Sequence, residues 1–321
     1  MKAAITTTAR YVPERIMTNF DLEKMVETSD EWIQTRTGIA ERHVVEKGQT
    51  SSFMATKVAK ILLHKSKTSP KDIDLIIIAT VTPDMLFPAT AALVQNNIGA
   101  HNAWGFDLSG ACTGFLYALE TGRLLVESGK YNKVIVIGVD TMSSILDYTD
   151  RNTCVLFGDG AGAMVVEAAE TPGIRSTHLH ADGAYAHLLQ VPVGVSTAHS
   201  ALAQGKAYTE MHGSEVFRWA VKAMGEVVKE ALEHNNMDQA DIDWLIPHQA
   251  NLRIIASTAK RAGLSMERVV VTVDHHGNTS AASIPLAFDE AVRDGRIQRG
   301  QNILLEGFGG GFTWGSILLT F

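Results

Sequence analysis

The segment Lys-Asp-Ile-Asp-Leu-Ile-Ile at residues 71–77 has a counterpart in the second half of the chain, Ala-Asp-Ile-Asp-Trp-Leu-Ile at residues 240–246. In both segments a short acidic stretch leads into a run of large apolar residues, which is typical of a strand buried on both faces. A repeated strand of this kind indicates that the two halves of the chain share one architecture.

Further matching positions support the repeat. They have the same separation as the two strands, about 168 residues, and chance does not explain this agreement. We therefore predict two similar βαβ-rich halves, residues 1–172 and 173–321, related by a pseudo-twofold axis. The matching positions are Asp107 and Gly110 with Asp274 and Gly277, and the strand end at Gly138 with the strand end at Gly307.

Short β-branched runs alternate with longer helical patterns, which indicates an α/β protein. Ligands of open α/β sheets bind at the carboxyl ends of the strands, so a twofold axis would bring the strand ends of both halves to one site. The expected strands cover 74–81, 103–108, 133–139, 161–167, 244–247, 269–272, 302–306 and 315–321. The expected helices cover 51–64, 89–97, 113–128, 215–234, 252–262 and 281–294.

The composition excludes several classes of protein. Hydrophobic residues make up 45% of the 321 residues and the net charge is −7 with scattered basic residues, so neither disorder nor nucleic-acid binding is expected. The two cysteines form no disulfide pattern and no Cys/His cluster at metal-ligand spacing, so we expect neither a disulfide framework nor a metal site of that kind. The sequence predicts no signal peptide and no membrane span, and it therefore favours a cytoplasmic protein.

Cys112 lies in Phe-Asp-Leu-Ser-Gly-Ala-Cys-Thr-Gly-Phe, between an expected strand and an expected helix. Gly110 and Gly114 permit a sharp turn there, and the N-terminus of a helix stabilises a thiolate or an oxyanion. This arrangement resembles a nucleophile elbow with sulfur in place of oxygen. A lone cysteine is more often a small buried residue, as we expect for Cys154, so the turn by itself leaves both interpretations of Cys112 open.

Two polar residues of the second half are expected near Cys112. His248 follows the strand at 244–247 and is expected to open the next helix, and Asn278 follows the strand expected at 269–272. Either could be an ordinary surface, core or turn residue, but their places at strand ends favour a shared site. The glycines of Gly-Phe-Gly-Gly-Gly at 307–311 weaken a strand and suit a close approach of the backbone to a ligand, as in an oxyanion hole. The absence of a Gly-Lys-Ser/Thr sequence argues against a phosphate-binding loop.

These residues and several longer motifs resemble those of a known family, the β-ketoacyl-acyl-carrier-protein synthases III, and the resemblance covers nearly the whole length of the chain. The resemblance implies a thiolase-like fold, layered α-β-α-β-α, and a catalytic triad of Cys112, His248 and Asn278. The motifs that carry it, besides the Cys112 segment, are Ser-Asp-Glu-Trp-Ile-Gln-Thr-Arg-Thr-Gly-Ile at 29–39, Gly-Asp-Gly-Ala-Gly-Ala at 158–163, His-Gln-Ala-Asn-Leu-Arg at 248–253, His-Gly-Asn-Thr-Ser-Ala-Ala-Ser at 276–283 and Phe-Gly-Gly-Gly-Phe-Thr-Trp-Gly at 308–315.

The resemblance also implies a mechanism without metal or organic cofactor. Cys112 would take the acyl group of an acyl-CoA primer, with the backbone N–H groups of Cys112 and Gly310 holding the oxyanion. His248 and Asn278 would then stabilise the enolate formed when malonyl-acyl carrier protein loses CO₂. The product would be a 3-ketoacyl-carrier protein, the first intermediate of type II fatty-acid synthesis.

The residues that the resemblance assigns to substrates fall into three sets, for the acyl group, for CoA and for the carrier protein. Phe87 resembles a residue that closes the acyl pocket across a homodimer interface, and its bulk favours a short primer such as acetyl. For CoA, the resemblance implies that Trp32 and Arg151 stack on the adenine. The other residues implied in binding CoA are Thr28, Arg36, Phe217 and Asn251. Residues expected to dock the acidic carrier protein are Arg218, Lys222, Arg253, Lys260 and Arg261, although each could equally be part of a solvated helix face.

Some features keep more than one function open. The segment 194–210 is longer than expected for the family and is predicted to be a surface loop that could alter access to the tunnel. Further members of the fold, such as acyltransferases or specialised-metabolite synthases, could keep Cys112 and His248 and change the acceptor. The chain could also be a cysteine hydrolase of acyl thioesters, or a non-catalytic acyl-carrier or scaffold protein.

Overall fold

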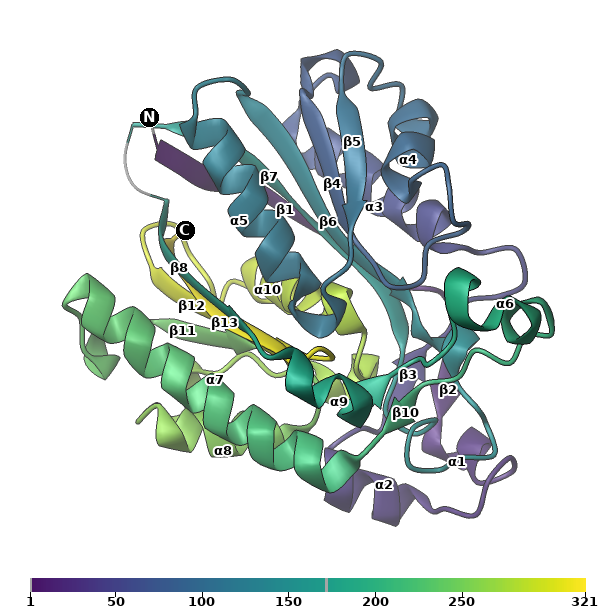
Figure 1. The fold of residues 1–321 in the computed structure, drawn as a ribbon. Helices are drawn as coiled ribbons and strands as arrows, with labels where there is room; N and C mark the ends of the chain where they lie inside the picture. Colours follow the sequence, from purple (N-terminus) through teal and green to yellow (C-terminus); the bar gives the residue numbers. More distant parts are fainter. Residues whose placement is uncertain (1, 171–172) are drawn as a thin grey trace.

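The computed structural model describes residues 2–170 and 173–321, which form two main β-sheets with helices on and between them (Figure 1). The five strands of the first sheet all come from before residue 171, and their order is β1-β7-β6-β4-β5. The four strands of the second sheet all come from after residue 172, in the order β11-β12-β13-β8. The boundary expected near residue 172 lies at the residues outside the described part of the chain.

The bounds of the elements are as follows. The first sheet contains β1 (Lys2–Tyr11), β4 (Leu75–Ala79), β5 (Trp104–Leu108), β6 (Lys133–Thr141) and β7 (Asp159–Ala169), and the second contains β8 (Ile174–Ala181), β11 (Trp244–Pro247), β12 (Asn302–Gly309) and β13 (Thr313–Thr320). Two small sheets pair β2 (Ile16–Thr18) with β3 (Glu41–His43) and β9 (Leu189–Gln190) with β10 (Glu210–Met211). The α-helices are α1 (Asn19–Leu22), α2 (Asp30–Thr37), α3 (Ser51–Ser66), α4 (Thr90–Ile98), α5 (Gly114–Glu127), α6 (Val195–Ala203), α7 (Gly213–Asn235), α8 (Leu252–Arg261), α9 (Val273–His276) and α10 (Ser283–Arg293).

The two sheets repeat one topology. In the first, β1-β7-β6-β4 are neighbours, and in the second β8-β13-β12-β11 follow the same order. The pairings agree as well, since β4 and β6 are parallel like β11 and β12, while β6 and β7 are antiparallel like β12 and β13. The repeat predicted from the sequence is therefore confirmed.

Three clusters of buried hydrophobic residues lie between the layers of helices and sheets. Helices α3 and α4 cover the outer face of the first sheet, α5 and α10 lie between the sheets, and α7 and α8 cover the outer face of the second sheet (Figure 1). Alternate residues of one strand pack against helices on opposite faces of the sheet, because successive side chains point to opposite faces. Ile77 of β4 packs in the central layer whereas Ile76 packs under α3 and α4. The expected α-β-α-β-α arrangement is thus present.

The strand expected at 269–272 does not form. Only one isolated bridge joins Leu245 to Val269, although the segment takes the place that β5 has in the first sheet. The side chain of Gln249 supplies the missing partner, since its Nε2 donates to the carbonyl of Val270 at 3.0 Å and its Oε1 accepts from the N–H of Thr272 at 2.8 Å. A side chain here satisfies backbone groups that a neighbouring strand would otherwise have to satisfy.

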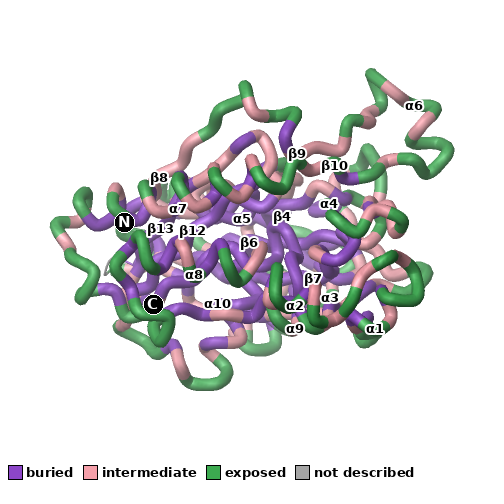
Figure 2. The backbone as a smooth tube through the Cα atoms, turned by 90° about the horizontal axis from the view of Figure 1, so that it is seen from below, coloured by how far each residue is buried: buried purple, intermediate pink, exposed green. Residues whose placement is uncertain are grey.

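The segment 194–210 differs in part from the expected surface loop. It contains α6, which has no buried residue and projects from the body of the molecule (Figure 2). The expected strands did not include β1 and β8. In both strands, threonines, histidines and other small or polar residues interrupt the apolar pattern of a buried strand.

No helix within the described ranges is long and apolar enough to cross a membrane.

Candidate active site

Cys112 lies on a tight turn at the end of β5. The 3₁₀-helix Ala111–Thr113 connects this strand directly to α5, and Ala111 has the positive φ of 46° that residues other than glycine rarely adopt. At Gly110 a Cβ atom would lie 2.9 Å from the Cα of Gly114, so the turn requires glycine there. Cys112 itself is only 7% exposed. The elbow expected around this cysteine is therefore present.

A second turn of the same kind faces the first. The 3₁₀-helix Ser280–Ala282 leads into α10, and Ser280 has a φ of 50°. Ala111 and Ser280 are 169 residues apart, the separation of the sequence repeat. The two turns meet, with the Sγ of Cys112 3.8 Å from the Oγ of Ser280. The pseudo-twofold axis thus brings the equivalent strand ends of both halves together.

The glycine-rich segment lies against the cysteine. Gly307 and Gly309 are part of β12, where they pair with Gly315 and Thr313. A Cβ atom on Gly309 would lie 2.8 Å from the backbone nitrogen of Cys112, so only glycine permits this approach. Gly310 lines a cavity together with Cys112. The close backbone approach agrees with expectation, while the oxyanion role of Gly310 stays a prediction.

His248 lies in the loop after β11 and does not open the next helix, because α8 begins at Leu252 with Asn251 as its N-cap. Its backbone N–H donates to the carbonyl of Glu306 at 2.8 Å. Its Nδ1 lies 2.6 Å from the Oγ of Ser283. Burial lowers the pKa of His248 to about 3, so the imidazole is neutral at physiological pH.

Asn278 follows α9 rather than a strand, and its backbone is tied to the first half of the chain. The N–H of Asn278 donates to the carbonyl of Leu156 at 2.8 Å, and the N–H of Gly158 donates to the carbonyl of Asn278 at 3.0 Å. The side-chain Oδ1 accepts from the N–H of Ser280 at 2.9 Å. The two backbone bonds fix the position of Asn278, which is 6% exposed, and the bond from Ser280 orients its side chain.

Cys112, His248 and Asn278 line one small pocket with a volume of about 110 Å³. On one side it shares Leu156, Met211, Gly213, Phe217 and Asn251 with an outer pocket of about 820 Å³. On the other side it shares Cys112, Phe157 and Leu189 with a largely apolar cavity of about 340 Å³, whose wall includes Leu202 of α6. Cys112 therefore lies between a wide entrance and an apolar chamber.

The resting cysteine is a thiol. Burial raises the pKa of Cys112 to about 12, although hydrogen bonds from Ser280 and from its own backbone act in the opposite direction. The carboxyl group of Asp140 raises the pKa further. Burial thus opposes formation of a thiolate at Cys112, and the expected stabilisation of a thiolate by the helix N-terminus stays a prediction.

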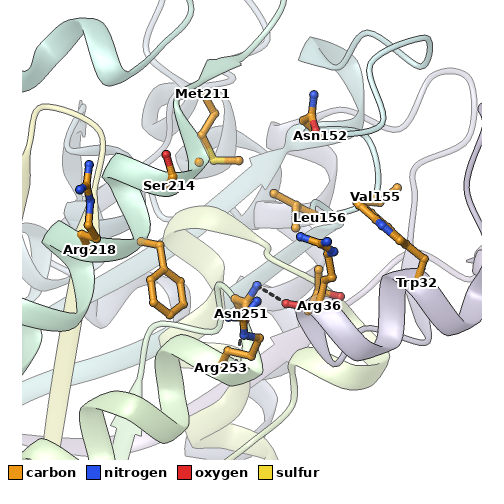
Figure 3. Close-up of a pocket in the computed structure, with 13 residues that line it drawn as sticks. Trp32, Arg36, Asn152, Val155, Leu156, Met211, Ser214, Arg218, Asn251 and Arg253 are labelled. Atoms are coloured by element: carbon orange, nitrogen blue, oxygen red, sulfur yellow. Dashed lines mark hydrogen bonds between the residues drawn. The ribbon is translucent and has the colours of Figure 1, made fainter.

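The outer pocket is basic. Arg36, Arg218 and Arg253 line it from α2, α7 and α8, and Asn251 donates from Nδ2 to the carbonyl of Arg36 at 3.0 Å (Figure 3). Trp32 forms one wall, with the guanidinium carbons of Arg36 and Arg151 each 5.1 Å from its ring centre. Such a pocket suits an anionic ligand that carries a planar ring.

The other residues expected to bind substrate do not all line this pocket. Phe217 and Asn251 line both the outer and the inner pocket. Thr28 does not line the outer pocket, and its hydroxyl is buried without a hydrogen-bond partner among the described residues. Phe87 is 83% exposed and lines none of the three cavities, so the structure does not place it at the site within one chain.

The basic residues expected to dock a partner are all exposed, and their docking role stays a prediction. Arg218 and Arg253 line the outer pocket. Lys222 lies over the ring of Trp219, with its Nζ 5.2 Å from the ring centre. Lys260 is in the last turn of α8, and Arg261 lies along α7, where its Cδ would be 3.0 Å from a Cβ on Gly225.

One cluster outside the pocket has the composition of a metal site. Possible ligand atoms of His275, His276 and Glu290 lie within 4.8 Å of one another. Arg10 already provides the positive charge, with its Nη1 3.0 Å from Glu290 and 3.2 Å from the Nε2 of His276. Hydrogen bonds to Asp274 and Glu290 raise the pKa of His275 to about 9, so it is protonated and a poor ligand at neutral pH. The cluster is an ion-pair network.

Sequence reasoning missed the residues that support the pocket. Ser280 and Ser283 lie in the segment 276–283 and Asp140 follows the strand expected at 133–139, but local pattern gives none of them a role. Asp140 is fully buried and accepts hydrogen bonds from Thr80, Val81 and Thr82. The separation of 169 residues between Ala111 and Ser280 is the signal that could have located the second turn.

Comparison with known sequences identifies relatives of the whole chain. The family described as 3-oxoacyl-[acyl-carrier-protein (ACP)] synthase III matches residues 106–183, and its C-terminal family matches residues 232–321. The β-ketoacyl-[acyl-carrier-protein] synthase III of Thioalkalivibrio sulfidiphilus is 56% identical over 319 residues, which cover 99% of each chain.

Solved structures of similar proteins superpose on the whole chain. The 3-oxoacyl-[acyl-carrier-protein] synthase III of Aquifex aeolicus superposes with a TM-score of 0.94 at 44% identity, covering 99% of this chain and 100% of the other. A priming β-ketosynthase of a polyketide biosynthetic pathway superposes with a TM-score of 0.95 at 35% identity, covering 99% and 96% of the two chains.

Proposed function

This chain belongs to the β-ketoacyl-[acyl-carrier-protein] synthase III family, the condensing enzymes that act in fatty-acid synthesis, and we propose that it joins a short acyl-CoA primer to malonyl-acyl carrier protein. The observation that supports this reaction best is the inner pocket. It combines a nucleophile, Cys112, with two neutral side chains that can donate hydrogen bonds, His248 and Asn278.

In the first half-reaction the sulfur of Cys112 attacks the thioester carbon of the primer. The Cys112–acyl bond forms as the bond to CoA breaks, and the thiol proton leaves with CoA. Because the resting group is a thiol, proton removal has to accompany the attack. The backbone N–H groups of Cys112 and Gly310 are the proposed oxyanion donors, and the glycines that let β12 approach Cys112 support this assignment.

In the second half-reaction the malonyl group loses CO₂, and the two electrons of the broken bond form an enolate. His248 and Asn278 would donate hydrogen bonds to the enolate oxygen. The enolate carbon attacks the acyl carbon on Cys112, and the released sulfur takes one proton from water. A neutral imidazole suits this step, because it donates a hydrogen bond without transferring its proton to the enolate.

The entrance supports a CoA thioester as donor. We propose that the phosphates contact Arg36 and the other arginines of the outer pocket while the pantetheine passes Phe217 and Asn251 to Cys112. The adenine would stack between Trp32 and Arg151. The present contact of 5.1 Å leaves no room for a base between these groups, so Arg151 has to move when the nucleotide binds.

The apolar cavity beyond Cys112 would hold the acyl group. The proposal that acetyl is the preferred primer depends on Phe87 of a second subunit closing this cavity. The loop that carries Phe87 supports a homodimer, since Leu86 and Phe87 are 70% and 83% exposed and a partner would cover them. Sedimentation of the chain and of Phe87→Asp tests the dimer.

The decisive experiment measures ¹⁴CO₂ released from [3-¹⁴C]malonyl-carrier protein by the purified chain, with and without acetyl-CoA. We expect release with formation of 3-ketoacyl-carrier protein, and a scan from acetyl- to longer acyl-CoA should show the highest rate with acetyl. Absence of CO₂ release despite acylated Cys112 would instead favour an acyltransferase, and hydrolysis of the acyl-enzyme by water would favour a thioester hydrolase.

A further inference from the structure

Ser283 is the first residue of α10, and its hydroxyl lies against the candidate catalytic histidine. The Oγ of Ser283 is 2.6 Å from the Nδ1 of His248, and both residues are only 2% exposed. The same Oγ accepts a hydrogen bond from the backbone N–H of Gln249 at 3.3 Å. These are its two hydrogen-bond partners among the described residues.

Counting protons assigns the direction of the bond to His248. A serine hydroxyl has one hydrogen to donate and two lone pairs that accept. If Nδ1 of His248 carried the proton, both it and Gln249 would donate to Ser283, and the hydroxyl hydrogen would have no acceptor in a buried site. If Nδ1 is unprotonated, the hydroxyl donates to it and accepts from Gln249, so every group is paired.

We infer that Ser283 is a positioning residue that holds His248 in the tautomer protonated on Nε2. This inference deepens the proposed function and rests on it, because His248 then offers an N–H donor to the pocket that it lines with Cys112 and Asn278. The other tautomer would present a lone pair to the enolate oxygen and repel it.

Asn278 is oriented from the same stretch of chain. The N–H of Ser280 binds the Oδ1 of Asn278 at 2.9 Å, just as the hydroxyl of Ser283 binds His248. In both cases a serine of the segment 280–283 binds one polar atom of the side chain, and the N–H donor has no other partner among the described residues. The two donors of the decarboxylation step are therefore set by one structural element.

The tautomer can be measured without any reaction. Two-bond ¹H–¹⁵N spectra of the chain labelled with ¹⁵N-histidine, compared with spectra of His248→Ala, identify the signals of His248 among those of the 12 histidines. We expect an unprotonated Nδ1 and a protonated Nε2 between pH 6 and 8. A protonated Nδ1 in the wild-type chain would overturn the inference, whatever the outcome for the proposed function.

The variant Ser283→Ala tests the consequence. We expect decarboxylation of malonyl-carrier protein to fall at least about tenfold, while acylation of Cys112 by acetyl-CoA stays at the wild-type rate. Ser283→Thr keeps the hydroxyl and should restore most of the decarboxylation. Ser316→Ala is the matched control, since Ser316 is also a buried serine, with its Oγ donating to the carbonyl of Val227 at 3.1 Å.

Each outcome of the variants has a defined meaning. Wild-type decarboxylation by a folded Ser283→Ala chain would overturn the inference, as would an equal loss in Ser316→Ala. If Ser283→Ala does not fold, the wild-type spectra and the activity of Ser283→Thr decide. A wild-type chain that releases no CO₂ contradicts the proposed function and still leaves the tautomer measurable.

Discussion

The Oδ1 atom of Asn278 accepts a hydrogen bond from the backbone N–H of Ser280 at 2.9 Å. The oxygen of the amide is thereby engaged, and the NH₂ group is the end that can bind a ligand in the pocket that Asn278 lines. The geometry therefore presents Asn278 as a hydrogen-bond donor.

Asn278→Ala removes that donor. Decarboxylation of malonyl-carrier protein should fall about 10²- to 10³-fold, the usual effect of losing one donor to a developing oxyanion. Acylation of Cys112, followed by mass spectrometry after mixing with acetyl-CoA, should continue. Asn97→Ala is the control, because Asn97 is exposed and its side chain forms one hydrogen bond with the described residues, from Nδ2 to the Oγ1 of Thr56. Loss of acylation in Asn278→Ala would contradict the division of roles between Cys112 and the second half of the chain.

The buried thiol of Cys112 should show its high pKa in its reactivity. Because burial raises this pKa to about 12, the thiolate fraction rises about tenfold for each pH unit below that value. The rate of alkylation of the free enzyme by iodoacetamide should therefore increase without a plateau from pH 7 to 10. The experiment is done in Cys154→Ser, which leaves one cysteine. A plateau below pH 9 would show that the site stabilises a thiolate after all.

Trp32 should contribute to binding through the nucleotide alone. Removal of an aromatic ring that stacks on a base costs about 1–3 kcal/mol, so Trp32→Ala should raise KM for acetyl-CoA about 5- to 150-fold. The same variant should leave turnover of acetyl-pantetheine, which lacks the nucleotide, unchanged. Equal effects on both substrates would mean that Trp32 supports the fold of α2 instead of contacting adenine.

His275 links stability to pH. Its pKa in the folded chain is raised to about 9, mainly by Asp274 and Glu290, so its contribution to stability is complete below pH 6.5 and disappears as the pH rises through 9. The melting temperature of the wild type should exceed that of His275→Gln at pH 6.5, and the difference should vanish by pH 10. Since the side chain is 35% exposed, solvent screens the ion pairs and the difference should not exceed about 4 °C.

The exposed His101 provides the comparison for that experiment. His101→Gln should have the same melting temperature as the wild type at both pH values, because His101 forms no salt bridge with the described residues. A difference between wild type and His275→Gln that grows above pH 9 would contradict the assigned ion-pair network.

Much of the site could be anticipated from local signals. The glycines around Cys112 predict its turn. The repeat predicts that strand ends of both halves meet, and the Sγ of Cys112 lies 3.8 Å from the Oγ of Ser280. The strand expected at 269–272 failed for a reason that local sequence does not contain. Its backbone groups are satisfied by Gln249, a side chain 20 residues earlier in the chain, and only the folded chain brings the two together.

The sequence by itself determined the α/β class, the repeated half, the turn at Cys112 and the family, because these depend on patterns of neighbouring residues and on a constant separation along the chain. Only the tertiary structure decided the chemical state of the site. Whether Cys112 rests as a thiol, and which nitrogen of His248 bears the proton, depend on desolvation and on hydrogen bonds from distant residues such as Ser283. Burial and partnership of this kind arise only when separate segments pack together.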